Sequence, residues 1–224
     1  MRRAPISEGE WYHCYNSGVD KRKVFTSQRD YERFLMLIFL CNGERNIQVS
    51  NIRNATLPRV LSNEKILRGD PLIELGAYCL LPNHIHFVIK ETQQGGIAAF
   101  MRKLFTGYTM YFNRQYKRTG PLFNGSYKSK HLSTDRYFKN AINYVHLNPI
   151  GLYEPNWKSS SGSLGIIEEK IRSYRYSSLA EHTGIERAER KILGDEVFTL
   201  FDAPSSLSTM LFDAQAFQRD GVDL

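Results

Sequence analysis

Two histidines separated by one residue, His84 and His86, carry the clearest chemical signal in this 224-residue chain. They lie within residues 81–90, a largely apolar run of the kind that favours a strand. Because residues i and i+2 of a strand point to the same face, both imidazoles would face one point in space. Two convergent neutral imidazoles supply part of an open metal site, and such a site can support catalysis.

A second signal is Tyr144 followed four residues later by Asn148, just before Pro149. Residues four apart share one face of a helix, so the phenol and the carboxamide should point the same way. A tyrosine hydroxyl can act as a covalent nucleophile, and an asparagine oxygen can complete a metal shell begun by two imidazoles. His146 should point away from Tyr144, so we do not expect it to join the same cluster or to act as a ligand.

Each of these residues also has a purely structural interpretation. His84 and His86 fit two histidines that are hydrogen-bonded inside a core. Tyr144 is one of 13 tyrosines and fits an ordinary core aromatic. Asn148 fits a plain helix end ahead of the proline.

Charge and cysteine usage narrow the class of protein. The chain has 30 Lys+Arg against 23 Asp+Glu, a formal net charge of +7, which favours a polyanionic partner. Its three cysteines are widely spaced, as in proteins that keep reduced thiols. The N-terminus lacks a signal-peptide pattern, and the longest apolar stretch, near residues 34–41, is too short to cross a bilayer. We therefore expect a cytoplasmic protein that does not enter membranes.

Hydrophobic periodicity predicts strands and helices in the order βαββαβα. A capping box at Ser27–Asp30 should open the first long helix, and Asn42-Gly43 should end it. Strand patterns cover residues 10–16, 72–81, 84–91 and 125–132, and helical patterns cover residues 27–41, 97–112 and 134–148. The polar stretch 46–71 is expected to hold a short helix near residues 58–67.

Most of these strands are too close in sequence for parallel crossovers, which predicts an α+β fold. We expect a ferredoxin-like or RRM-like sandwich with a largely antiparallel sheet and helices on one face. RNA-recognition domains of that shape bind single strands on the free face. Residues 1–184 should form one domain with a poorly patterned insertion at about 46–71, and residues 185–224 a C-terminal extension.

Four stretches resemble the single-tyrosine HUH transposases, in particular the branch of REP-associated tyrosine transposases. The stretches are residues 16–21 (NSGVDK), 78–86 (YCLLPNHIH), 120–123 (GPLF) and 144–149 (YVHLNP), within a likeness that runs from Tyr12 to Gly184. A bare His-x-His is weak evidence, but Leu-Pro-Asn before it and Tyr-x-His-x-Asn-Pro downstream make the pattern highly specific. The resemblance makes residues 1–184 the transposase domain.

This resemblance implies metal-dependent cleavage and rejoining of single-stranded DNA that carries hairpins. Tyr144 would attack a phosphodiester, leaving a 5′-phosphotyrosine and a free 3′-hydroxyl, and the reverse step would rejoin strands. His84, His86 and Asn148 would hold Mg²⁺ or Mn²⁺ at the scissile phosphate. No nucleotide cofactor is needed because transesterification conserves the bond energy. Many relatives dimerise, so a homodimer and a monomer both stay open.

Two positions depart from the family pattern: Ser17 and Ser126 stand where relatives often have arginine. Losing two cations near the DNA could weaken binding or change its target. Other basic residues are expected to contact DNA phosphates, although a solvated basic surface is the alternative. They form three groups: Lys128, Lys130 and His131; Arg114, Lys117 and Arg118; and Lys21, Arg22 and Lys23.

Two other function classes remain open. One is a metallohydrolase with a metal-bound water, although the common zinc pattern of His-x-His followed closely by Asp-His is missing after His86. The other is a non-catalytic single-stranded nucleic-acid-binding regulator on the same fold. The presence of Tyr144 favours catalysis over that alternative.

Overall fold

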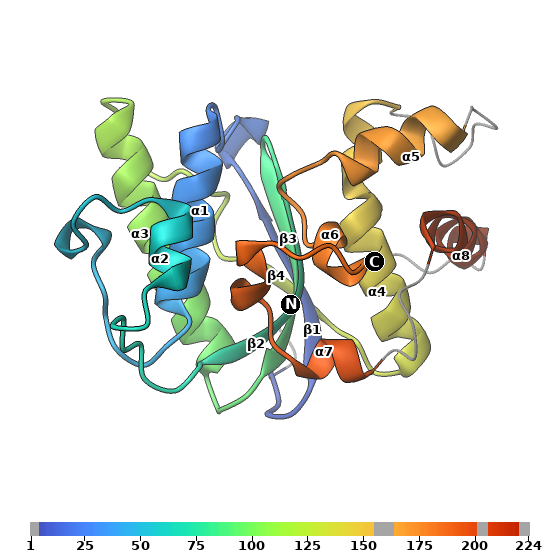
Figure 1. Cartoon of the computed structure of the whole chain (residues 1–224), viewed down its shortest axis with the longest axis horizontal. Helices are drawn as coiled ribbons and strands as arrows, with labels where there is room; N and C mark the ends of the chain where they lie inside the picture. Colours follow the sequence, from blue (N-terminus) through green and yellow to red (C-terminus); the bar gives the residue numbers. More distant parts are fainter. Residues whose placement is uncertain (1–4, 155–163, 201–205, 220–224) are drawn as a thin grey trace.

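A four-stranded antiparallel sheet forms the centre of the computed structural model, which describes residues 5–154, 164–200 and 206–219 (Figure 1). Its strands are β1 (Trp11–Ser17), β2 (Ile73–Leu81), β3 (His84–Glu91) and β4 (Lys128–His131), in the order β2-β3-β1-β4. The helices are α1 (Gln28–Cys41), α2 (Leu57–Ser62), α3 (Gly96–Gln115), α4 (Asp135–Leu147), α5 (Leu164–Arg172), α6 (Leu179–His182), α7 (Glu196–Thr199) and α8 (Leu207–Arg219). Short 3-10 turns are η1 (Val19–Lys21), η2 (Val49–Asn51), η3 (Asn148–Leu152) and η4 (Ala188–Ile192).

The predicted element order is confirmed, and with it the α+β class and the antiparallel sheet. Helix α1 begins with the expected capping box, in which Ser27 and Asp30 bond each other's backbone N–H groups. The short helix expected near residues 58–67 is α2, and it ends already at Ser62. Two parts of the expected C-terminal extension, residues 201–205 and 220–224, lie outside the described residues.

Helices lie on both faces of the sheet, which corrects the expectation that they cover one face only. Figure 1 shows α1, α2 and α3 on one side and α4, α5 and α8 on the other. Neighbouring residues of β3 accordingly belong to different cores, with Phe87 packed beneath α1 and α3 and Val88 packed beneath α4. The physical reason is that β2 and β3 are apolar on both faces, and a sheet of that composition must be covered on both faces.

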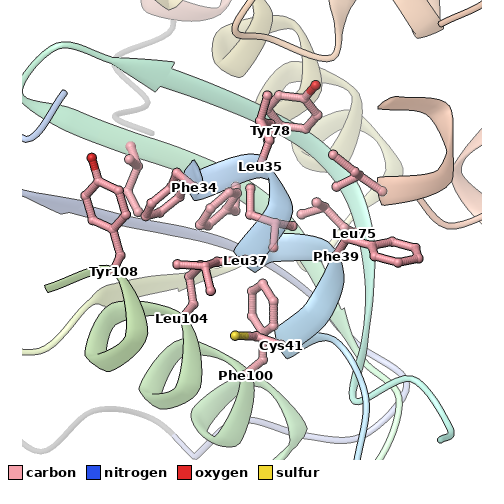
Figure 2. Close-up of a cluster of buried hydrophobic side chains, with 14 of the residues drawn as sticks. Phe34, Leu35, Leu37, Phe39, Cys41, Leu75, Tyr78, Phe100, Leu104 and Tyr108 are labelled. Carbon is pink, nitrogen blue, oxygen red and sulfur yellow. The ribbon is translucent and has the colours of Figure 1, made fainter. Parts of the chain in front are cut away.

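The larger core lies between the sheet and the helix pair α1 and α3 (Figure 2). Phe34 and Leu35 of α1 and Phe100 and Leu104 of α3 are almost completely buried there. Tyr108 of α3 donates its hydroxyl hydrogen to the Val24 carbonyl oxygen over 2.5 Å, which satisfies the polar tip of a buried ring. This packing fixes α1 and α3 against one face of the sheet.

The smaller core joins α4 to the opposite face. Thr134 caps the helix by accepting a hydrogen bond from the Tyr137 backbone N–H over 3.2 Å, as N-cap threonines commonly do. Ile142 and Val145 then pack against Val88, and Phe138 contacts the Trp11 ring with 4.8 Å between ring centroids. These contacts set where the C-terminal half of α4 lies on the sheet.

Backbone hydrogen bonds join the β2–β3 turn to the segment that follows β1. The Gly18 backbone N–H donates to the Asn83 carbonyl oxygen (2.8 Å), and the Val24 N–H donates to the Pro82 carbonyl oxygen (2.7 Å). A Cβ atom on Gly18 would lie 2.3 Å from the Arg22 carbonyl oxygen, so the close approach requires glycine. The His84 end of β3 is therefore anchored by backbone bonds.

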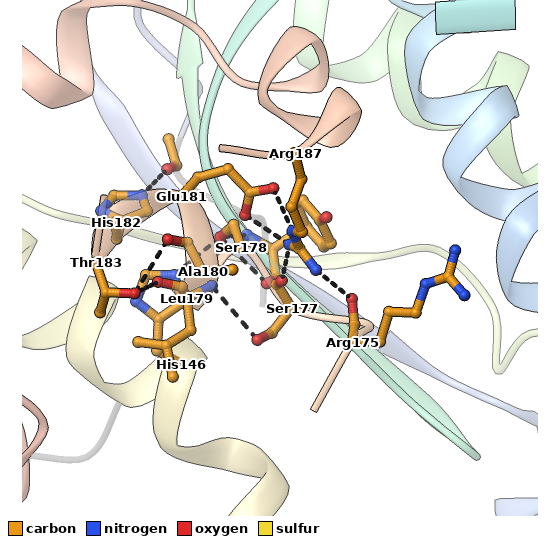
Figure 3. A network of polar contacts seen from close by, with 12 residues as sticks. His146, Arg175, Ser177, Ser178, Leu179, Ala180, Glu181, His182, Thr183 and Arg187 are labelled. Atoms are coloured by element: carbon orange, nitrogen blue, oxygen red, sulfur yellow. Dashed lines mark hydrogen bonds and ion pairs between the residues drawn. The ribbon is translucent and has the colours of Figure 1, made fainter. Parts of the chain in front are cut away.

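Residues 176–178 cover the outer edge of β2 and tie it to α4 (Figure 3). The Leu80 N–H donates to the Tyr176 carbonyl oxygen (2.9 Å), and the Ser178 N–H donates to the Tyr78 carbonyl oxygen (3.0 Å). Ser178 Oγ also lies 2.8 Å from Nε2 of His146 on α4. The segment thereby satisfies an otherwise open sheet edge.

Within the described ranges, none of the helices is long and apolar enough to cross a membrane.

Truncating the α4–sheet contact should destabilise the fold. Ile142→Ala removes a side chain that is 2% exposed and should lower the free energy of unfolding by about 2–5 kcal/mol, measured by urea denaturation. Met110→Ala is the matched control, because that side chain is 68% exposed and its loss should cost less than about 0.5 kcal/mol. Equal effects of the two substitutions would contradict the packing described for α4.

Candidate active site

His84 and His86 share the face of β3 that α4 covers, as their spacing predicted. Their ring centroids are 5.1 Å apart and the rings are nearly perpendicular, at 83°. His86 is buried and His84 is half-buried. The pair therefore opens towards α4 and not towards the α1–α3 core.

A hydrogen bond to Asn83 sets the tautomer of His84. His84 Nδ1 lies 2.7 Å from Asn83 Oδ1, and a carboxamide oxygen can only accept, so the imidazole carries its proton on Nδ1. Nε2 is then unprotonated and can act as a ligand. The Asn83 of the Leu-Pro-Asn motif thus has a definite physical role.

His13 of β1 is a member of the site that the sequence analysis missed. Its Nε2 lies 2.9 Å from His86 Nδ1, and the two rings stack at 13° with centroids 5.2 Å apart. Such a bond orients a ligand imidazole through the nitrogen that does not face the metal. His13 shares one face of β1 with Trp11 and Tyr15, but only the pairing of β1 with β3 shows which histidine it reaches.

Tyr144 of α4 lies directly over this histidine pair. Its ring centroid is 5.6 Å from the centroids of both His13 and His86, and its ring is close to perpendicular to them, at 76° and 84°. Tyr144 is half-buried, so the ring is packed without being sealed in the core. The structure thus brings together the tyrosine and the histidines that the sequence placed 58 and more residues apart.

Asn148 lies one helical turn beyond Tyr144, at the end of α4. Its Nδ2 donates to the Tyr144 carbonyl oxygen over 2.8 Å, which satisfies a carbonyl at the helix C-terminus. That bond fixes the carboxamide so that Oδ1, the atom able to bind a cation, is the one left to point elsewhere. Asn148 is half-buried.

The donor set fits a divalent cation only if Asn148 or substrate oxygens complete it. In the part of the chain that the structure describes, no three His, Cys, Asp or Glu side chains converge to hold a metal ion. The fit comes from the tautomer of His84, the His13–His86 bond and the free oxygen of Asn148. An incomplete shell of this kind is typical of catalytic sites and not of structural ones.

Burial keeps these imidazoles neutral. Desolvation lowers the pKa of His13 to about 4, with a smaller contribution from the Lys130 charge. Desolvation also lowers the pKa of His86 well below 6.5, helped by His13 and His84, and lowers that of His84. Neutral imidazole is the form that binds metals, so no proton needs to be displaced at neutral pH.

Two of the predicted DNA-contacting residues lie beside the site. Lys128 pairs with Tyr15 and Lys130 with His13 in the β1–β4 register, and residues paired in this way share a face. His131 faces the opposite side, where its Nε2 lies 2.9 Å from Glu10 Oε2. The structure therefore separates His131 from the two lysines.

The other two predicted basic groups lie elsewhere. Lys21 and Arg22 belong to the turn after β1, whose Gly18 bonds Asn83 at the His84 end of the sheet. Arg114 lies on α3, and Lys117 and Arg118 follow that helix, on the opposite side of the sheet from α4. Ser17, where relatives often have arginine, pairs directly with His84.

His146 lies in the interior, as the helix geometry predicted. It is 0% exposed, and its Nε2 contacts Ser178 Oγ while its ring lies 4.6 Å from that of His182 (Figure 3). It belongs to the network that joins α4 to β2. Its role is structural.

Comparison with known families settles the class. The model of the family described as "Transposase IS200 like" matches residues 37–148, half of the chain. The chain belongs to the IS200-like transposase family. The match includes His84, His86, Tyr144 and Asn148, and it confirms the enzyme class predicted from the motifs.

Two further comparisons complete this description of the transposase. A solved structure of a REP-associated tyrosine transposase bound to a REP hairpin is similar over 92% of this chain and 96% of that chain, with 13% identity and a TM-score of 0.49. The comparison with curated protein sequences gave no match. The family assignment accordingly rests on the family model.

The buried histidines predict that this transposase loses stability in mild acid. Because the folded pKa values of His13 and His182 are lowered to about 4, the unfolded chain takes up protons first as the pH falls below about 6.5. The contribution of the two neutral histidines to stability is fully present above that pH. By pH 5, protonation of the unfolded chain should lower the free energy of unfolding by about 2 kcal/mol for each histidine. Urea denaturation at pH 7.5 and pH 5 measures the change, and a flat profile would contradict it.

Proposed function

We propose that this transposase cleaves and rejoins single-stranded DNA, with Tyr144 as the nucleophile. The observation that carries the proposal is the position of the Tyr144 ring, 5.6 Å from both His13 and His86 on a common face. The family match supports DNA transposition as the biological class. The motif resemblance supports hairpin-forming repeats as the substrate.

The proposed step is an in-line displacement at phosphorus. The Tyr144 hydroxyl oxygen forms a bond to the phosphate, and the bond from phosphorus to the 3′-oxygen breaks. The phenolic proton is lost and the leaving 3′-oxygen gains one, so the step is balanced. The products are a 5′-phosphotyrosine and a free 3′-hydroxyl, and attack by a 3′-hydroxyl of another strand reverses the reaction.

His84, His86 and Asn148 are the residues that would hold a divalent cation, Mg²⁺ or Mn²⁺. When bound, it would polarise the scissile phosphate and stabilise developing charge. For His86 to present Nε2, its Nδ1 must carry the proton and donate it to His13 Nε2. His13 therefore acts as the positioning residue of the site.

Lys128 and Lys130 extend the same face with positive charge, which suits them to hold phosphates next to the scissile one. Lys21 and Arg22 lie near the His84 end and would serve the same purpose. We keep Arg114, Lys117, Arg118 and His131 as proposed DNA contacts outside the face of the sheet that carries Tyr144. A homodimer is a compatible assembly.

Tyr144→Phe should abolish covalent attachment. The substitution removes the attacking oxygen and keeps the ring, so binding of single-stranded hairpin DNA should change less than about twofold while adduct formation falls at least about 1000-fold. A denaturing gel with end-labelled hairpin DNA measures the covalent adduct, and a native gel with the same DNA measures binding. The matched control is Tyr137→Phe, which makes the same change at the other tyrosine of α4.

The outcomes separate the alternatives. Cleavage by the Tyr144→Phe variant without an adduct would indicate a metal-bound water as nucleophile. Binding without cleavage by the native chain would indicate a non-catalytic regulator. Either result would overturn the tyrosine mechanism.

Metal binding should depend on His84 and on His13. His84→Ala should weaken Mn²⁺ binding at least about tenfold by loss of a ligand, and His13→Ala should weaken it by about 10–100-fold through loss of ligand orientation. Isothermal titration with Mn²⁺ measures both, and chelation with EDTA should stop cleavage. His131→Ala, which removes an exposed imidazole, is the control; unchanged affinity in the His84 and His13 variants would exclude this site.

A further inference from the structure

A basic groove lies in the layer of α1 and α3, on the far side of the sheet from Tyr144. Its volume is about 1060 Å³, and its walls are α1, α3 and the segment of residues 46–55. The lining includes the cations Arg29, Arg33, Arg102, Lys103 and Arg114. Among its described lining residues there is no aspartate or glutamate, so the groove has a single sign of charge.

The cations extend along the length of the groove. Arg102 and Arg114 of α3 are both exposed and both line the groove, and the twelve residues between them correspond to about 18 Å along the helix axis. Arg29 and Arg33 are one turn apart on α1. The Tyr111 hydroxyl donates to Asp30 Oδ1 (3.0 Å). Because Arg114 follows Tyr111 by one helical turn and Arg29 directly precedes Asp30, Arg29 and Arg114 lie at the same end of the groove.

Arg33 is held in place by the protein. Its guanidinium lies over the Tyr111 ring, 4.9 Å from the centroid, in a half-buried position. Lys103 is differently used, since its Nζ donates to the carbonyl oxygens of Gly43 (2.5 Å) and Arg45 (3.1 Å). Four arginines therefore supply the charge that a ligand would meet.

The carboxylate on this side of α1 is hydrogen-bonded to uncharged groups inside the protein and not to the groove arginines. Asp30 is 0% exposed and accepts hydrogen bonds from Thr26, Tyr111 and Tyr116. Those bonds satisfy the carboxylate inside the protein. The positive charge of the groove is thus left for a partner.

We propose that this groove binds the phosphate backbone of duplex DNA, apart from the single strand presented to Tyr144. Cations spread over about 18 Å can contact several phosphates of one DNA strand. Single-strand sites add aromatic platforms for base stacking. Of the described residues lining the groove, only Tyr111 is aromatic, and Arg33 covers its ring.

This inference rests on the proposed function only for the choice of DNA as the polyanion. A hairpin substrate has both a single strand and a duplex stem. Since α4 and the α1–α3 layer lie on opposite faces of the sheet, the two parts would contact opposite sides of the molecule. A stem held here would position the strand without taking part in the chemistry.

The test is the salt dependence of binding to a blunt 20-base-pair duplex, measured by fluorescence anisotropy on the full chain. The groove variant is Arg29→Gln with Arg102→Gln and Arg114→Gln. It should bind at least about tenfold more weakly near 100 mM salt and lower the slope of log K against log salt by about 3. The matched control is Lys65→Gln with Arg172→Gln and Lys191→Gln, three exposed cations outside the groove with the same total charge change.

Three results would overturn the proposal. One is unchanged duplex binding by the groove variant, and another is an equal loss in the control variant, which would indicate diffuse attraction by net charge. The third is displacement of the duplex by polyglutamate as readily as by unlabelled duplex, which would indicate an acidic protein partner. A blunt duplex offers no strand for adduct formation, so these results are independent of the Tyr144 test.

Discussion

The packing of α4 against the sheet is the constraint on which the rest of the structure depends. Ile142 and Val145 bury their side chains on Val88, and this contact places the last turn of α4 above the histidines of β3. The centroid of the Tyr144 ring then lies 5.6 Å from that of His86. The geometry of the proposed site is accordingly a consequence of apolar burial, since burial of a few aliphatic side chains supplies several kcal/mol.

Burial of the histidines follows from the same contact. A helix over the sheet removes water from the imidazoles, which lowers the pKa values of His13 and His86 and keeps both neutral. The His13–His86 and His84–Asn83 bonds offset part of the cost of burying these polar rings, because buried donors and acceptors need partners. His13 Nδ1 has no such partner among the described residues. The site is preorganised before any ligand arrives.

The two faces of the sheet carry two different proposed functions. Alternation along β1 and β3 directs one set of side chains to the α1–α3 core and the other to the proposed site. The α4 face carries Tyr144, His84 and the lysines of β4, while the helices of the other face carry the arginine groove. Because successive side chains of a strand point to opposite faces, the proposed catalytic site and the proposed duplex contact lie on opposite sides of the sheet.

The sequence by itself determined the seven main elements, the His84–His86 convergence and the Tyr144–Asn148 helix face, because each depends on local periodicity over a few residues. It did not show that α4 covers the second face of the sheet, nor that His13 bonds His86. Both depend on which strands pair and on where a helix packs, and contacts between distant residues follow from the burial of the whole chain. Only the tertiary structure decided that the tyrosine and the three histidines meet.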